Sequence, residues 1–214
     1  MMHEHTLRVG RSARVVTLGP LEQPVASVWI ALHGYGQLGP RFARRFASLD
    51  DGSRLVVVPE GLSRYYVDHG TGVVGASWMT REDRDREIDD YVQYLDDVAA
   101  WLPAGAASAP RTVLGFSQGS ATAWRWLTRG TCRHPDRLII WGGEIPTDLD
   151  LSDAPSRLRD MKVVLVTGTE DPYCPPAKLA RYATQLEDVG LTCTTRTFVG
   201  GHDLDAATLA ALAA

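Results

Sequence analysis

The pentapeptide Gly115-Phe116-Ser117-Gln118-Gly119 places a serine between two glycines, a pattern that supports nucleophilic chemistry. It follows a short apolar run that indicates a buried strand, and it precedes residues 120–127, whose composition indicates a helix. A sharp turn between strand and helix strains the serine backbone, and flanking glycines avoid collisions with both elements. Such a turn would hold the Ser117 hydroxyl above the sheet, at the positive end of the helix dipole.

A nucleophilic serine needs a base within hydrogen-bond reach and an acid that orients this base, because its hydroxyl keeps its proton at neutral pH. Asp171 follows the apolar run 163–167, and His202 follows two glycines after a later run. The order Ser117, Asp171, His202, with each residue just after a strand, predicts a catalytic triad. Glu144, which follows an earlier run, is the alternative for the acid.

Two N–H groups must stabilise the oxyanion that attack by the serine would create. The apolar run 28–32 ends in His33-Gly34-Tyr35-Gly36-Gln37, whose glycines allow a tight turn. We expect the N–H of Tyr35 and the N–H of Gln118, the residue after the nucleophile, to donate together to this oxyanion. We expect His33 to brace this loop rather than to titrate in catalysis.

Alternating strands and helices must bring these residues to one edge of a sheet. The predicted strands are the apolar runs 28–32, 55–58, 112–116, 138–141, 163–167 and 194–199. Residues 84–102 form the clearest helix, with apolar side chains at steps of three and four and Thr80 and Asp83 as possible caps. This alternation predicts a mostly parallel sheet with helices on both faces and a site at the carboxyl ends of its strands. We also expect an N-terminal hairpin from residues 6–9 and 13–18.

Composition narrows the range of functions. The 214 residues, 44% of them hydrophobic, suit a single domain over residues 1–214. A net charge of −4 without a basic block argues against a nucleic-acid partner, and no apolar run approaches the roughly 20 residues that span a bilayer. The three cysteines lack metal-ligand spacing and no signal-peptide core is present, so we expect free thiols, no metal and a cytoplasmic location.

The motifs together resemble those of proteins with the α/β-hydrolase fold. Within it, the chain is similar to the phospholipase/carboxylesterase group, which includes acyl-protein thioesterases and small bacterial carboxylesterases. The glutamine of Gly-Phe-Ser-Gln-Gly is typical of this group. The matching segments are 32–36, 115–119, 168–172 and 201–202, and Pro59-Glu60-Gly61 with Ser77-Trp78 adds a further match. The resemblance implies Ser117 as nucleophile, His202 as base and Asp171 as orienting acid, with Tyr35 and Gln118 as oxyanion donors and no cofactor.

The loops around the site suggest how substrate is held. Residues 60–81, rich in aromatic residues and glycine, are expected to shape one wall of the pocket. The interval 142–162 is too short for a large cap domain, which predicts an open site. The carboxylate of Glu144 argues against long, purely apolar acyl chains. The predicted substrate-binding residues are Trp78, Met79, Glu144, Ile145 and Tyr173.

We therefore expect a serine hydrolase that cleaves small-molecule carboxylic esters or thioesters with short- to medium-chain acyl groups. Its rate should rise with pH as the catalytic imidazole loses its proton. A peptidase or another acyl hydrolase of the same fold is an alternative, because one triad serves many leaving groups. A catalytically silent ligand-binding module is another, although such proteins usually lose a triad member. The sequence is compatible with a homodimer and predicts no stable membrane insertion.

Overall fold

The computed structural model describes residues 1–151, 158 and 160–214. Within them, a seven-stranded sheet has the order β1-β3-β2-β6-β7-β8-β9. The strands are β1 (Val15–Leu18), β2 (Ser27–Leu32), β3 (Arg54–Pro59), β6 (Arg111–Phe116), β7 (Arg137–Trp141), β8 (Lys162–Gly168) and β9 (Cys193–Phe198). All neighbouring pairs are parallel except β1 and β3. The six strands predicted from apolar runs are confirmed.

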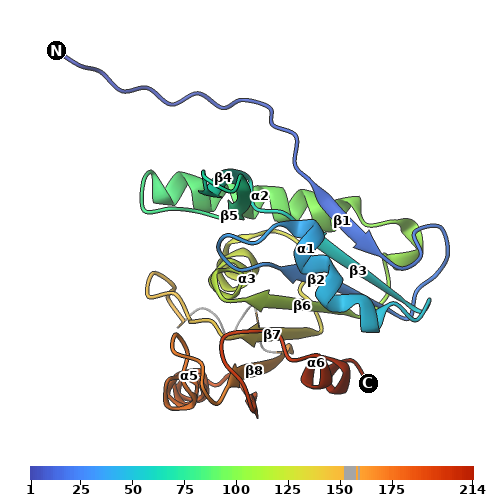
Figure 1. Cartoon of the computed structure of the whole chain (residues 1–214). Coiled ribbons are helices and arrows are strands. Elements are labelled where there is room, and N and C mark those ends of the chain that lie inside the picture. The colour runs from blue at the N-terminus through green and yellow to red at the C-terminus, as the bar shows by residue number, and fades with distance from the viewer. Residues whose placement is uncertain (152–157, 159) are drawn as a thin grey trace.

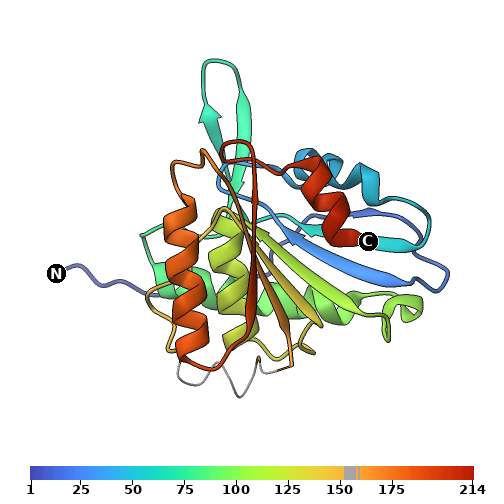
Figure 2. The same cartoon turned by 90° about the horizontal axis from the view of Figure 1, so that it is seen from below.

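Helices cover both faces of this sheet because its strands are apolar on both sides. In β2, Val28, Ile30 and Leu32 point into one hydrophobic cluster, whereas Trp29 and Ala31 point into the other. The first cluster lies under α2 (Arg84–Trp101), α3 (Gln118–Arg129) and α5 (Pro176–Asp188). The second lies under α1 (Gly39–Ala43), the 3-10 helix η1 (Arg44–Leu49) and α6 (Ala206–Ala213). Figure 2 shows these two groups of helices on opposite sides of the strands.

The start of α2 differs from the predicted capping. Asp83 occupies the N-cap position with a φ of 48°, but its side chain makes no capping hydrogen bond. Its carboxylate pairs with Arg86 instead, at 3.1 Å. The hydroxyl of Thr80 donates to Glu87 within the helix at 3.1 Å, so Thr80 is bound to the first turn without capping it. The helix nevertheless begins at residue 84, as expected, and ends at Trp101, one residue before the expected end.

The predicted N-terminal hairpin is wrong. Residues 1–14 contain neither strand nor helix, and residues 1–13 are exposed and extend away from the sheet as an arm (Figure 1). β1 pairs with β3 in antiparallel orientation, with Val16 opposite Val58. Pairing with a core strand gives β1 partly buried side chains. Residues 6–9 are exposed and have no such strand to pair with among the described residues.

A β-hairpin lies within residues 60–81, where the sequence predicted only a loop. β4 (Ser63–Asp68) and β5 (Val73–Ser77) pair in antiparallel orientation and project from the body of the molecule (Figure 2). At the turn, the Asp68 carboxylate accepts a hydrogen bond from the N–H of Gly70 at 2.8 Å. The end of β5 turns back towards the sheet and leads to Trp78, which is buried.

Two further features bear on the site. The connection between β7 and β8 covers only residues 142–161, which is too short for a large cap domain; residues 152–157 and 159 of it lie outside the described residues. Within the described residues, β9 forms an edge of the sheet, pairs only with β8 and exposes most of its side chains. No helix in the described ranges is both long and apolar enough to cross a membrane.

Candidate active site

Ser117 occupies a sharp turn between β6 and α3, as the motif predicts. Its φ of 54° and ψ of −117° lie in a region of backbone conformation that residues other than glycine rarely adopt. The two glycines of the motif are required by close contacts. A Cβ at Gly115 would lie 2.4 Å from the carbonyl oxygen of Gly119, and one at Gly119 would lie 2.1 Å from that of Leu32. The strain and the packing together present the serine at the carboxyl end of the central strand.

The structure brings the three predicted triad residues together. The Ser117 hydroxyl lies 2.9 Å from His202 Nε2, and His202 Nδ1 lies 2.7 Å from Asp171 Oδ2. The imidazole is also flanked by two aromatic rings, those of Phe116 and Tyr173, with centroids 5.0 and 4.8 Å away. These contacts fix the orientation of the ring, which is what a general base requires.

Asp171 is held in its ionised form. Burial raises the pKa of this carboxyl, but hydrogen bonds from His202 and from the N–H groups of Cys174 and Tyr173 outweigh burial and lower the pKa below its ordinary value. The two N–H groups bind Oδ1 at 2.9 and 2.8 Å. The charged carboxylate accepts a hydrogen bond from Nδ1–H of His202. The lone pair of Nε2 therefore faces the serine hydroxyl.

The loop at the end of β2, which contains Tyr35, lies beside the nucleophile turn. A Cβ at Gly34 would lie 3.2 Å from the Ser117 Cβ, so this loop packs directly against the turn. The N–H groups of Gly34 and Gly36, on either side of Tyr35, already donate to protein oxygens at 2.8 and 2.9 Å. Among the described residues, no protein atom accepts a hydrogen bond from the N–H of Tyr35 or Gln118. Both groups are thus free to bind a ligand oxygen.

His33 braces this loop from behind. Its Nε2 accepts a hydrogen bond from the N–H of Gly61 at 2.9 Å, so the ring proton lies on Nδ1, which donates to the carbonyl of Gly34 at 2.8 Å. Burial lowers the pKa of His33, against smaller opposing effects of the Gly34 carbonyl and the Glu60 charge. The imidazole is therefore neutral, and it serves as a structural link between two loops.

Two predicted substrate-binding residues are instead packing residues. Trp78 is 2% exposed, and its Nε1–H donates to the carbonyl of His33 at 2.9 Å. Ile145 is 7% exposed and belongs to the hydrophobic cluster under α2, α3 and α5. Met79 is partly buried, and its carbonyl accepts a hydrogen bond from the side chain of Gln118. Sequence reasoning considered Gln118 only for its N–H and missed this role of its side chain.

Glu144 and Tyr173 lie at the surface near the triad. The Glu144 carboxylate pairs with Lys178 Nζ at 3.0 Å, whereas the imidazole of His202 binds Asp171, so the structure favours Asp171 as the orienting acid. Tyr173 is 69% exposed, and its ring contacts the imidazole. Of the five predicted substrate-binding residues, only Tyr173 combines an exposed side chain with a contact to the triad.

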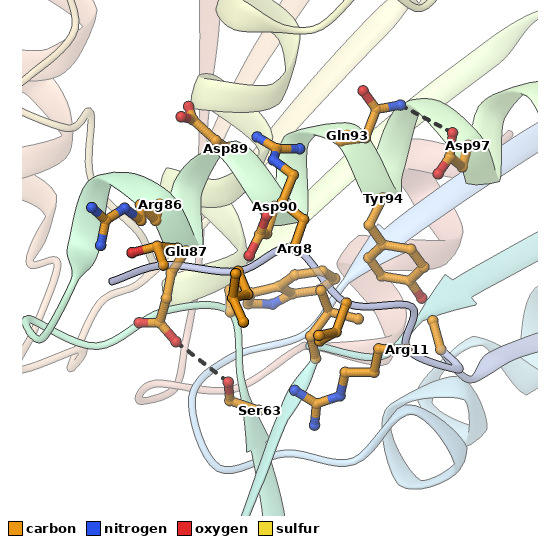
Figure 3. Close-up of a pocket in the computed structure, with 16 residues that line it drawn as sticks. Arg8, Arg11, Ser63, Arg86, Glu87, Asp89, Asp90, Gln93, Tyr94 and Asp97 are labelled. Atoms are coloured by element: carbon orange, nitrogen blue, oxygen red, sulfur yellow. Dashed lines mark hydrogen bonds between the residues drawn. The ribbon is translucent and has the colours of Figure 1, made fainter. Parts of the chain in front are cut away.

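A cavity of about 680 Å³ lies elsewhere, between the N-terminal arm and α2 (Figure 3). Arg8 and Arg11 from the arm and Glu87, Asp90 and Tyr94 from α2 line it, and no triad residue does. In the described part of the chain, no hydrogen bond or ion pair joins residues 6–13 to α2. No group of three or more His, Cys, Asp or Glu side chains among the described residues is placed to hold a metal ion, and the three cysteines are free.

Comparison with known proteins agrees with this fold. The family model for phospholipase/carboxylesterase proteins matches residues 16–214. Esterase PE8 superposes with a TM-score of 0.72 at 21% identity, over 95% of this chain and 97% of its own. Acyl-protein thioesterase 2 from Zea mays gives 0.73 at 19%, over 94% and 96%, and the Bacillus cereus carboxylesterase gives 0.64 at 16%, over 94% and 92%. Identities this low establish a shared fold, and comparison with the curated proteins gives no match. The chain belongs to the phospholipase/carboxylesterase family and is an esterase-type hydrolase with the α/β-hydrolase fold.

Proposed function

We propose that the chain is a single-domain serine hydrolase that cleaves carboxylic esters or thioesters with short- to medium-chain acyl groups. The observation that carries the proposal is the continuous hydrogen-bonded chain from Ser117 Oγ through His202 to Asp171, with distances of 2.9 and 2.7 Å. A serine in this arrangement can lose its proton as it attacks, because the imidazole accepts it and the carboxylate stabilises the resulting imidazolium.

The reaction follows from this geometry in two halves. Ser117 Oγ attacks the acyl carbon and passes its proton to His202 Nε2, while the N–H groups of Tyr35 and Gln118 donate to the oxyanion. His202 then protonates the alcohol or thiol, which leaves, and the acyl group remains on Ser117 as an ester. Water attacks this ester with His202 again as the base, so that a carboxylic acid is released and the serine is restored.

The openness of the site supports a short or medium acyl group. The connection between β7 and β8 is too short for a large cap domain, and the side chains of Tyr35 and Tyr173 beside the triad are 61% and 69% exposed. A long acyl chain needs an enclosed apolar tunnel to leave water. The apolar side chains of Trp78 and Ile145, which the sequence predicts to bind substrate, are buried in protein contacts and line no such tunnel. The alcohol or thiol part of the substrate can extend into solvent.

Labelling with a fluorophosphonate, followed by peptide mass spectrometry, tests the activated serine without a choice of substrate. We expect one adduct per chain on Ser117, no adduct in Ser117→Ala or His202→Ala, and wild-type labelling in Ser53→Ala, where an exposed serine far along the chain is removed. No adduct on the folded wild-type protein would refute the proposal and favour a silent binding module.

A substrate panel then tests the acyl group. We expect p-nitrophenyl acetate and butyrate, and the matching thioesters, to be cleaved with a higher kcat/KM than palmitoyl esters or peptide amides. Faster cleavage of peptide amides would identify a peptidase instead. Faster cleavage of palmitoyl esters would show that the short-chain assignment is wrong.

A further inference from the structure

The backbone segment 76–79, at the end of the β4–β5 hairpin, contacts both loops that carry the proposed oxyanion donors. One loop is 33–37, which contains Tyr35. The other is the turn after β6, which contains Gln118. The two N–H groups belong to different strand ends, so their separation depends on whatever links those ends.

The link to the first loop consists of three hydrogen bonds. The N–H of Gly36 donates to the carbonyl of Ala76 at 2.9 Å, and the N–H of Ala76 donates to the carbonyl of Gln37 at 3.2 Å. The indole N–H of Trp78 donates to the carbonyl of His33 at 2.9 Å. The loop around Tyr35 is thus held on both sides by the same short segment.

The link to the second loop is the side-chain amide of Gln118. Its Nε2 donates to the carbonyl of Met79 at 2.9 Å and to the hydroxyl of Ser77 at 3.0 Å, and its Oε1 accepts from the N–H of Trp78 at 3.2 Å. The Ser77 hydroxyl has one proton, which it donates to the Met79 carbonyl at 2.7 Å, so it is an acceptor towards Gln118. Both ends of the amide are therefore paired, and its orientation is determined by its partners.

We propose that the side chain of Gln118 is a positioning element: it fastens its own N–H, the second oxyanion donor, to the segment that holds the first. This inference rests on the proposed function. Donors stabilise an oxyanion only when both lie at hydrogen-bond distance from the oxygen as it becomes charged. A shift of about 1 Å in such a group can cost about 100-fold in rate.

The test replaces the amide without removing the backbone donor. Gln118→Met has a similar length and no polar contacts to segment 76–79. Gln93→Met is the matched control, because Gln93 is exposed on α2 and its amide donates to Asp97, on the same helix, at 3.1 Å. We expect kcat for p-nitrophenyl acetate to fall about 10- to 100-fold in Gln118→Met, with KM changed less than about twofold. The control should match the wild type.

Two readouts separate positioning from mere stability. A phenylboronic acid that forms a tetrahedral adduct on Ser117 should lose affinity in parallel with kcat, because it uses the same two donors. The pH dependence of kcat should keep its midpoint, because the triad contacts are untouched. A folded Gln118→Met that keeps kcat within twofold, or that changes KM alone, would overturn the inference.

A second variant decides the question if Gln118→Met does not fold. Gln118→Glu keeps the length of the side chain but replaces the donor Nε2 by an oxygen that cannot donate to the Met79 carbonyl, so the same selective loss of kcat is expected, and an unchanged kcat would overturn the inference. Labelling of Ser117 by a fluorophosphonate in the wild-type protein distinguishes the proposed function from the role of Gln118. If Ser117 is not labelled, the proposed function is refuted. If Ser117 is labelled and kcat is unchanged in both variants, only the role of Gln118 is refuted.

Discussion

Substitution of Asp171 separates catalysis from stability, because its two carboxylate oxygens have different partners. Oδ2 binds His202 Nδ1 at 2.7 Å, whereas Oδ1 accepts the N–H groups of Tyr173 and Cys174 at 2.8 and 2.9 Å. In Asp171→Asn, the amide oxygen can replace Oδ1 and the amide NH2 then faces the imidazole. In Asp171→Ala, both sets of hydrogen bonds are lost.

The expected magnitudes differ accordingly. An amide that donates to Nδ1 leaves the imidazole proton on Nε2, and a protonated Nε2 cannot accept the proton of Ser117. The analogous change in another serine hydrolase lowers kcat about 10,000-fold. That loss corresponds to about 5 kcal/mol of transition-state stabilisation, with little change in the free energy of unfolding. Asp171→Ala should lose similar activity. It also leaves two N–H groups of the turn without an acceptor, at about 1–3 kcal/mol each, or about 2–6 kcal/mol of unfolding free energy.

The two variants are compared by kcat/KM for p-nitrophenyl acetate and by urea unfolding, monitored through the fluorescence of the six tryptophans. Wild-type unfolding gives the reference for both. Activity in Asp171→Asn above about a hundredth of wild type would refute the assignment of Asp171 as the group that sets the tautomer. Equal stability of the Asn and Ala variants would show that the Oδ1 hydrogen bonds do not hold the turn.

Three further outcomes are expected. Gly142→Ala should lower kcat about 10- to 100-fold, because a Cβ there lies 3.0 Å from the acid of the triad, whereas Gly52→Ala, also at positive φ but in open space, should cost only about 1 kcal/mol of stability. Hydrogen bonds from Arg125 hold the pKa of Asp148 well below its usual range, so its stabilising effect is present above about pH 4 and is lost as the pH falls. Asp148→Asn should therefore lower the urea-unfolding free energy by about 1–3 kcal/mol at pH 7 and by less near pH 2; an equal loss at both values would contradict this. Burial raises the pKa of all three thiols, that of Cys132 to about 12, so iodoacetamide should label the native protein more slowly than the urea-unfolded chain, as counted by mass spectrometry.

The parts of the site that follow from sheet geometry could be predicted from the sequence. Parallel strands place their carboxyl ends at one edge, so Ser117, Asp171 and His202 could be assigned together from their positions after apolar runs. The turn at Ser117 was also predictable, because its glycines have a steric cause that is visible in the motif. These predictions needed only local patterns and one general rule of topology.

The predictions that depended on burial were less successful. Trp78 and Ile145 lie in segments next to the site, but whether such a side chain faces a pocket or the core depends on contacts with distant elements. The β4–β5 hairpin was missed for a related reason: its glycine-rich turn indicates a loop, and in the described part of the chain its strands pair with each other and with the rest of the fold through a single bridge between Ala76 and Gln37. The N-terminal hairpin was predicted wrongly because residues 13–18 contain a strand whose partner is not the neighbouring segment 6–9 but β3, which is far along the chain.

His202, the proposed base, follows β9, one of the two edge strands of the sheet. In the part of the chain that the structure describes, β6, which leads to Ser117, has a neighbour on each side, whereas β9 has only β8 and exposes most of its side chains. Edge strands with few buried contacts open locally at lower free energy than central ones. Brief fraying of β9 would separate the imidazole from the serine while the core remains intact. On warming, esterase activity should therefore decline reversibly before the tryptophan signal of unfolding changes, and the working temperature of the enzyme would be limited by one edge strand rather than by its core.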